Sequence, residues 1–168
     1  MADPTRSPDQ QLAVDLAVDA GRLLVDLRTS GPTRRALGDL GDRRANTLIL
    51  DRLAAERPGD AVLSEESRDD PARVGADRVW IIDPVDGTRE YGLGDRPDWA
   101  VHVALWEPAG AVLSATTVDL PAQGLTRSVL DDVSAPAPLP TDRLALNARR
   151  SVDSRFAIPA PPTAPTPC

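Results

Sequence analysis

Residues 80–91 constrain the fold more than any other stretch, and they read Trp-Ile-Ile-Asp-Pro-Val-Asp-Gly-Thr-Arg-Glu-Tyr. Such a short apolar run is typical of a buried strand, and Pro84 predicts that the strand opens into a loop. Asp83 and Asp86 then lie on one stiff turn, where their charges repel each other and Gly87 lets the backbone approach a ligand. A hard divalent cation would offset that repulsion. The alternative is a solvated acidic loop, since polar loops are the usual connection between elements.

A second acidic segment lies upstream. Residues 63–67, Leu-Ser-Glu-Glu-Ser, close another short apolar run. If both strands end at the same edge of one sheet, then Glu65, Asp83 and Asp86 converge. The sequence therefore predicts a carboxylate cluster at one edge of a sheet.

The order of these motifs resembles that of a known family. Ser-Glu-Glu-Ser at 64–67, a strand, and Asp-Pro-Val-Asp-Gly-Thr at 83–88 are similar to the metal-dependent, lithium-sensitive phosphatase superfamily that includes inositol monophosphatase. The continuation Gly-Thr-Arg-Glu-Tyr at 87–91, with residues 98–105, looks most like its 3'(2'),5'-bisphosphate nucleotidase branch, the CysQ type.

The resemblance implies a site for two or more magnesium ions. It assigns Glu65, Asp83 and the backbone carbonyl of Val85 to a first Mg²⁺, and it assigns Asp83 and Asp86 to a second. A set of oxygen donors suits magnesium and argues against zinc or copper. Sensitivity to lithium follows from the same resemblance.

The resemblance also implies roles in catalysis and substrate binding. Glu65 and Thr88 would orient the attacking water, and with the backbone amides of Gly87 and Thr88 they would contact the substrate phosphate. Asp42 matches an acidic position that serves catalysis through an additional, weaker metal site. From the sequence alone Asp42 is equally an N-cap of the helix that follows it, and both roles can coexist.

Hydrophobic periodicity predicts an α+β fold. Apolar residues at spacings of three and four predict helices over residues 9–28 and 43–56, with a loop over 33–41 between them. Strands are expected at residues 61–64, 78–82, 99–106 and 111–118. Two helices packed on a mainly antiparallel sheet agree with the N-terminal half of the layered αβαβα sugar-phosphatase fold that the resemblance implies. His102 is expected to be packed and hydrogen-bonded within the sheet.

The chain is expected to divide into three parts. Residues 1–130 form an inositol monophosphatase-like N-terminal domain, 131–157 a linker with one extra strand, and 158–168 a disordered proline-rich tail. The second domain of such phosphatases carries a Trp-Asp motif that this sequence lacks. We therefore expect a chain truncated or frameshifted after about residue 130, whose uncovered apolar surface favours a homodimer or poor solubility.

Composition excludes several classes of partner. The 168 residues carry a formal net charge of −7, which disfavours nucleic-acid binding because that binding depends on clustered Lys and Arg. The apolar runs are far shorter than the roughly 20 residues that a bilayer requires, and no targeting segment is recognisable. Cys168 is the single cysteine, so no disulfide is expected. We expect a cytoplasmic protein that binds a small phosphorylated substrate.

These features predict a magnesium-dependent phosphate monoester hydrolase. The branch resemblance implies a 3'(2'),5'-bisphosphate nucleotidase of sulfate assimilation, which converts 3'-phosphoadenosine 5'-phosphate to AMP and phosphate. Arg89 and Tyr91, which follow the acidic turn, either shape substrate entry or form an exposed pair. The alternatives are inositol monophosphatase or fructose-1,6-bisphosphatase activity, and a catalytically impaired remnant that still binds metal.

Overall fold

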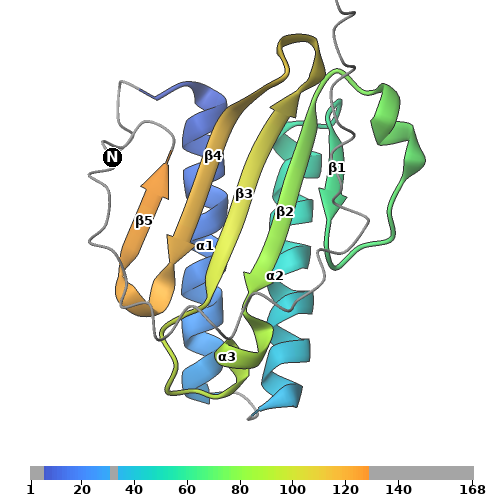
Figure 1. Ribbon diagram of the computed structural model, residues 1–168. Helices are drawn as coiled ribbons and strands as arrows, with labels where there is room; N and C mark the ends of the chain where they lie inside the picture. Colours follow the sequence, from blue (N-terminus) through green and yellow to red (C-terminus); the bar gives the residue numbers. More distant parts are fainter. Residues whose placement is uncertain (1–5, 31–33, 129–168) are drawn as a thin grey trace, which may run out of the picture. The chain divides into compact units, whose positions relative to one another are not determined.

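A five-stranded sheet in the order β1-β2-β3-β4-β5 forms the centre of the computed structural model (Figure 1). The strands are β1 (Ala61–Ser64), β2 (Val79–Asp86), β3 (Ala100–Glu107), β4 (Val112–Leu120) and β5 (Leu125–Ser128). β1 pairs with β2 in parallel, whereas the other three pairs are antiparallel. The structure describes residues 6–30 and 34–128, so the predicted linker at 131–157 and tail at 158–168 lie outside the described residues.

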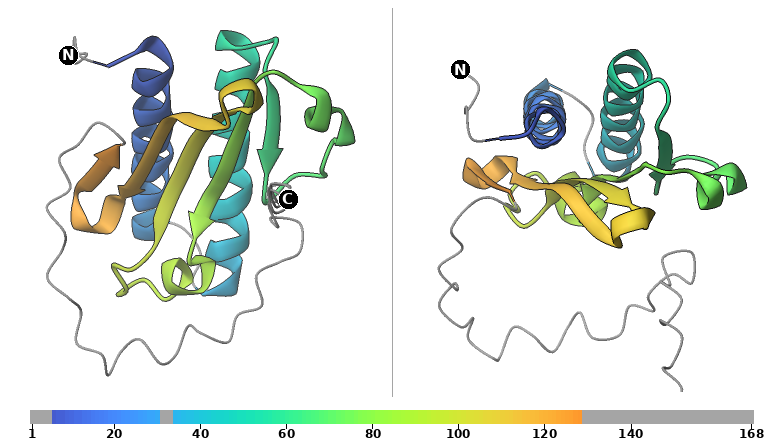
Figure 2. Two further views of the ribbon diagram at one scale, coloured as in Figure 1. Left: turned by 45° about the horizontal axis from the view of Figure 1, so that its top comes forward. Right: turned by 90° about the horizontal axis from the view of Figure 1, so that it is seen from above.

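Two long helices cover one face of this sheet. Figure 2 shows α1 (Pro8–Ser30) and α2 (Arg35–Glu56) on the same side, and the short helix α3 (Thr88–Gly92) follows β2 directly. Three 3₁₀ turns complete the described elements: η1 (Pro71–Gly75), η2 (Pro108–Gly110) and η3 (Pro121–Gln123). The predicted α+β class, with two helices on a mainly antiparallel sheet, is confirmed. None of the described helices combines the length and apolar character needed to cross a membrane.

The core lies between the two long helices and the sheet. Along α1 the buried side chains recur at the helical spacing, and along β2 and β3 every second side chain points towards the helices. These core residues include Leu12, Leu16, Ala20, Leu24, Ile49, Trp80, Ile82, Val101, Val103 and Leu105. The intervening positions Ile81, Ala104 and Trp106 are only half-buried, because they belong to the other face of the sheet.

Helix α2 begins earlier than the sequence predicts. It starts at Arg35 instead of residue 43. Residues 35–41, which the sequence predicts to be a loop, are therefore helical, and that part of the prediction is wrong. Gly38 and Gly41 suggest a loop, but they are helical because α3 packs there: an added Cβ would lie 2.9 Å from Thr88 Cγ2 and 2.5 Å from Tyr91 Cε1, respectively. Asp42 is therefore a residue of the helix interior, and its predicted role as N-cap is wrong.

Strand β2 also extends beyond its predicted end. It runs through Pro84 to Asp86 instead of stopping at Ile82, because a register shift between Asp83 and Asp86 accommodates the proline. The sequence does not predict helix α3 or strand β5. Both are too short for a periodic pattern to identify them.

An ionic cluster ties several elements together at the start of β2. The Arg78 guanidinium donates to Asp60 at 2.9 Å, to Asp9 at 2.9 Å and to Glu107 at 3.1 Å. Asp9 also accepts a hydrogen bond from Arg57 at 2.9 Å. Burial opposes ionisation of Asp9, but the hydrogen bonds from Arg57 and Arg78 outweigh it and lower its pKa. The cluster therefore joins α1 and the end of α2 to β2 and β3.

Replacement of Asp9 by Asn should destabilise the fold in a pH-dependent way. At neutral pH we expect the free energy of unfolding to fall by about 1–2 kcal/mol, since charged hydrogen bonds to two arginines are lost. The stabilisation is present above the ordinary aspartate pKa of 3.8 and is lost as the pH falls through the lowered pKa of Asp9. Urea unfolding at several pH values measures this. A loss that stays constant down to the acid limit would contradict the assignment, and Asp51→Asn, on the exposed side of α2, is the control.

Candidate metal and active site

The parallel pairing of β1 and β2 brings the two acidic segments to one end of the sheet. Ser64 pairs with Ile82, and the amide of Glu65 donates to the carbonyl of Ile82 at 3.1 Å. Glu65 is therefore the next position after the last paired residue, as Asp83 is on β2. The two carboxyl groups are close enough for the negative charge of Glu65 to raise the pKa of Asp83.

Asp83 is the most strongly perturbed acid of this cluster. Burial raises its pKa to about 8, and the negative charges of Glu65 and Asp86 act in the same direction. The Val85 amide opposes this effect by donating to Asp83 Oδ1 at 3.2 Å. The ionised cluster is therefore unfavourable by itself, and a nearby cation would favour its charged form.

Asp42 and Thr88 form a second part of the site. Asp42 is 8% exposed and lies within α2, and its Oδ1 is 3.4 Å from the hydroxyl of Thr88 at the start of α3. The same hydroxyl lies 3.1 Å from the Val85 carbonyl, to which it donates. Burial first, and then the charge of Glu66, raise the pKa of Asp42 to about 7. Asp42 thus lies beside Thr88 and near the Glu65–Glu66 pair.

Asp86 lies at the outer edge of the cluster and is more exposed. Its Oδ2 is 3.6 Å from Nε2 of His102 on β3, and both side chains are roughly half exposed. The sequence predicts a packed, hydrogen-bonded histidine, and this is wrong, because His102 belongs to the face of the sheet opposite the helices. The antiparallel register, which pairs Asp83 with His102, is the signal that would have placed the histidine beside the acids.

Gly87 is required by the turn itself. Its φ of 84° lies in the left-handed region, and an added Cβ would lie 3.2 Å from the Asp98 carbonyl oxygen. The sequence predicts that this glycine lets the backbone approach a ligand. In the structure, the backbone that it approaches is the protein's own segment at 98–99.

Tyr91 anchors α3 to the core. It is fully buried, its hydroxyl donates to the Leu24 carbonyl at 2.9 Å, and its ring meets that of Trp99 edge to face at 4.9 Å. The Arg28 guanidinium lies over both rings. The interpretation of Tyr91 as a residue of the substrate entrance, or as an exposed side chain, is therefore wrong.

The oxygen donors near Asp83 are of the kind that bind a hard cation, but their side chains do not enclose a metal site. Within the ranges 6–30 and 34–128, no three His, Cys, Asp or Glu side chains lie close enough to enclose a metal ion. The carboxyl groups of Glu65, Asp83 and Asp86 and the carbonyl of Val85 are nevertheless all oxygen donors at one strand end. Their mutual repulsion, visible in the raised pKa of Asp83, is of the kind that a divalent cation relieves.

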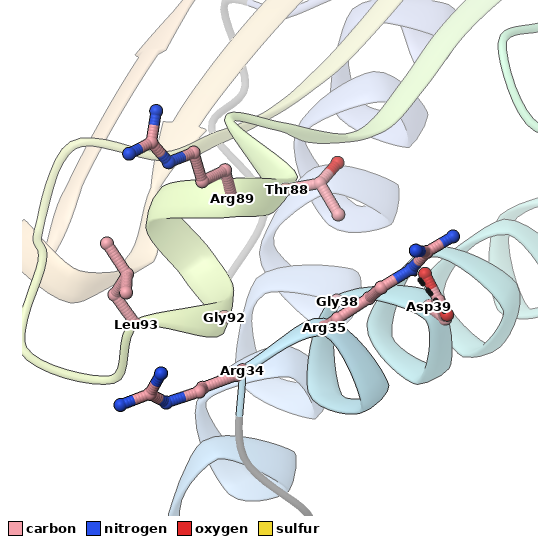
Figure 3. A pocket seen from close by; sticks show the side chains of 8 residues that line it. All are labelled: Arg34, Arg35, Gly38, Asp39, Thr88, Arg89, Gly92 and Leu93. Atoms are coloured by element: carbon pink, nitrogen blue, oxygen red, sulfur yellow. Dashed lines mark ion pairs between the residues drawn. The ribbon is translucent and has the colours of Figure 1, made fainter.

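A pocket of about 260 Å³ is lined in part by Thr88. Figure 3 shows its lining at the junction of α2 and α3: Arg34, Arg35, Gly38, Asp39, Thr88, Arg89, Gly92 and Leu93. Thr88 and Arg89 are candidate residues from the sequence, whereas Arg34 and Arg35 are not. The adjacent arginines before an amphipathic helix are the signal that could have identified them.

The comparison with protein families decides the relationship. Residues 16–126 match the Inositol monophosphatase family. The chain belongs to that family. A curated relative, the 3'-phosphoadenosine 5'-phosphate phosphatase of Mycobacterium leprae, is 53% identical over 138 residues, which are 77% of this chain and 51% of the relative. The chain thus spans about half the length of this relative, and the resemblance to the CysQ branch is confirmed.

Solved structures of the family share the fold. The SuhB protein of Bartonella henselae superposes with a TM-score of 0.62 and 27% identity, over 73% of this chain and 48% of that protein. CysQ from Bacteroides thetaiotaomicron gives a TM-score of 0.61 and 25% identity, over 77% of this chain and 48% of that protein. The described sheet and helices therefore correspond to about half of a family member.

Replacement of Gly38 by Ala should disturb Thr88. The new methyl group would lie 2.9 Å from Thr88 Cγ2 and 3.3 Å from the Thr88 carbonyl oxygen, so α3 must shift. We expect a net loss of about 1–2 kcal/mol in the free energy of unfolding, because this steric cost exceeds the better helix propensity of Ala. Urea unfolding and the NMR shift of the Thr88 methyl group measure the two effects.

The matched control is Gly59→Ala, where an added Cβ has no neighbour within 4 Å. This variant should leave both the stability and the Thr88 signal close to their original values. Equal behaviour of the two variants would show that the contact between Gly38 and Thr88 does not restrict the site.

Proposed function

We propose that this chain provides the metal-binding part of a magnesium-dependent phosphate monoester hydrolase that acts on 3'-phosphoadenosine 5'-phosphate. The observation that carries this proposal is the position of Asp83 at the end of β2, where the negative charges of Glu65 and Asp86 both act on it. The 53% identity to a phosphatase named for that substrate supports the choice of substrate.

The carboxyl groups of Glu65, Asp83 and Asp86 and the carbonyl of Val85 would hold Mg²⁺. When bound, the metal would neutralise charge on the phosphoryl oxygens and increase the acidity of a water molecule. Hard oxygen donors favour magnesium over zinc or copper. Sensitivity to lithium remains a prediction of the family resemblance.

Thr88 is the proposed positioning group for the attacking water. Its hydroxyl proton is directed to the Val85 carbonyl at 3.1 Å, so the oxygen keeps a lone pair that accepts a hydrogen bond from water. Glu65 would accept the second proton of that water, and the backbone amides of Gly87 and Thr88 would donate to the phosphate. Asp42, 3.4 Å from the Thr88 hydroxyl, would serve the additional metal site.

Several finer assignments belong to the same proposal. The cytoplasm is the expected location, a small phosphorylated molecule is the expected partner, and a homodimer is the expected oligomer. Inositol monophosphate and fructose 1,6-bisphosphate are the alternative substrates. A chain that binds metal without turnover is the alternative function, motivated by its match to about half of its relatives' length.

The test measures Mg²⁺ binding and phosphate release with the 168-residue chain. Calorimetry should show Mg²⁺ binding, and 3'-phosphoadenosine 5'-phosphate should release phosphate faster than the two alternative substrates. Asp83→Asn should weaken Mg²⁺ binding at least about tenfold and abolish turnover, and chelation of the metal should do the same. Asp51→Asn is the charge-matched control, because Asp51 is exposed on α2 and does not belong to the cluster.

The outcomes separate the candidate functions. Metal binding with turnover that depends on Asp83 supports the hydrolase, and the preferred substrate decides among the three activities. Binding without turnover identifies a metal-binding protein that is not an enzyme by itself. If Asp83→Asn and the unchanged chain bind Mg²⁺ equally, the site assignment is wrong.

A further inference from the structure

Asn46 is a buried polar residue of α2 that lies beside the first acidic segment. It is 9% exposed, and its carboxamide contacts two serines, one at the end of β1 and one just beyond it. The Ser64 hydroxyl donates to Asn46 Oδ1 at 2.7 Å, and Asn46 Nδ2 donates to the Ser67 hydroxyl at 3.0 Å. A carboxamide offers both an acceptor and a donor, so this one side chain binds two separate hydroxyl groups.

The two serines are the first and last residues of a turn. The Ser67 amide donates to the Ser64 carbonyl at 3.4 Å across Glu65 and Glu66, which is the pattern of a β-turn. Inside the turn, the Glu66 amide donates to Ser64 Oγ at 3.3 Å. Both glutamates are exposed. The anchored ends of the turn, rather than packing of the glutamate side chains, therefore determine where the two carboxyl groups lie.

The same face of α2 also holds the other part of the candidate site. Asp42 precedes Asn46 by four residues, so the two side chains lie one helical turn apart on one face. Asp42 Oδ1 is 3.4 Å from the Thr88 hydroxyl. Burial, and then the charges of Glu66 and Glu65, raise the pKa of Asp42, so these carboxyl groups lie near one another. One helix face thus sets the spacing between Thr88 and the glutamates.

A neutral side chain suits position 46. The carboxyl groups that already act on one another at this end of the sheet are those of Asp42, Glu65, Glu66, Asp83 and Asp86. An aspartate at this position would add to their repulsion, and a lysine or arginine would compete with a divalent cation for them. The carboxamide of Asn46 holds the turn without changing the charge of the cluster.

We propose that Asn46 is a positioning residue for the metal site: through Ser64 and Ser67 it holds the turn that carries Glu65, so that this carboxylate is directed to Mg²⁺. The inference rests on the proposed function, which it deepens by naming a residue outside the proposed ligand set on which the metal affinity depends. Asn46 itself contacts neither the metal nor the substrate.

The test compares the Mg²⁺ affinity of the full chain and its variants by calorimetry. Asn46→Ala should weaken Mg²⁺ binding about tenfold, because the turn loses both of its side-chain anchors. Ser67→Ala removes only one anchor at a half-buried position, so it should weaken binding less, and it keeps the test open if Asn46→Ala does not fold. The double variant should bind Mg²⁺ as Asn46→Ala does, since the two residues act through one contact. Circular dichroism and melting curves verify that each variant is folded.

Gln10→Ala is the matched control for a loss of stability. The carboxamide of Gln10 is also buried and also joins a helix to the sheet: it donates to the Thr116 carbonyl and accepts from the Thr116 amide, both at 3.0 Å. Its removal should lower the melting temperature and leave the Mg²⁺ affinity unchanged. If Gln10→Ala and Asn46→Ala weaken Mg²⁺ binding equally, the effect comes from stability and the positioning role is wrong.

Hydrogen exchange of the backbone amides, measured without metal, separates this inference from the proposed function. In Asn46→Ala the amides of Glu66 and Ser67 should exchange faster, whereas Gln10→Ala should leave them no less protected than their neighbours. Faster exchange, together with a failure of the unchanged chain to bind Mg²⁺, supports Asn46 as the anchor of the turn and contradicts the proposed function. Mg²⁺ binding that Asn46→Ala leaves unchanged overturns the positioning role and leaves the proposed function intact.

Discussion

The burial of Val85 is the contact on which the candidate site depends. Its side chain is 3% exposed in the core, so the chain must turn back towards the helices after Asp83. Both of its backbone groups then act in the site, because the amide donates to Asp83 and the carbonyl accepts from Thr88. One apolar side chain thereby fixes the spacing between the acidic end of β2 and the start of α3.

The two ends of β2 have opposite electrostatic character. At its start Arg78 is paired with three carboxylates that hold the helices and strands together. At its end Asp83 is half-buried near two other acids, Glu65 and Asp86. Burial and these negative charges all raise the pKa of Asp83. Stabilising charge pairs are thus concentrated away from the acidic end, whose unfavourable charges are characteristic of functional sites.

Patterns with a clear local cause were predictable from the sequence. The apolar periodicity of α1 follows from the burial of one helix face, and β1 has its expected bounds. The start of α2 was not predictable, because its glycines are helical only through contact with Thr88 and Tyr91. The proximity of His102 to Asp86 likewise depends on strand register, which no single segment encodes.

The connection between β1 and β2 has a consequence for sequence variation. Its outer part is exposed, with Val74 at 77%, and an added Cβ at Gly75 meets no atom within 4 Å. Its two ends are fixed independently, by the hydrogen bond from Glu65 to Ile82 and by the ion pairs of Arg78. Each doubling of loop length costs only about 0.6 kcal/mol in closure entropy. Insertions near Gly75, even of a whole reporter domain, are therefore compatible with an unchanged arrangement of the acidic residues.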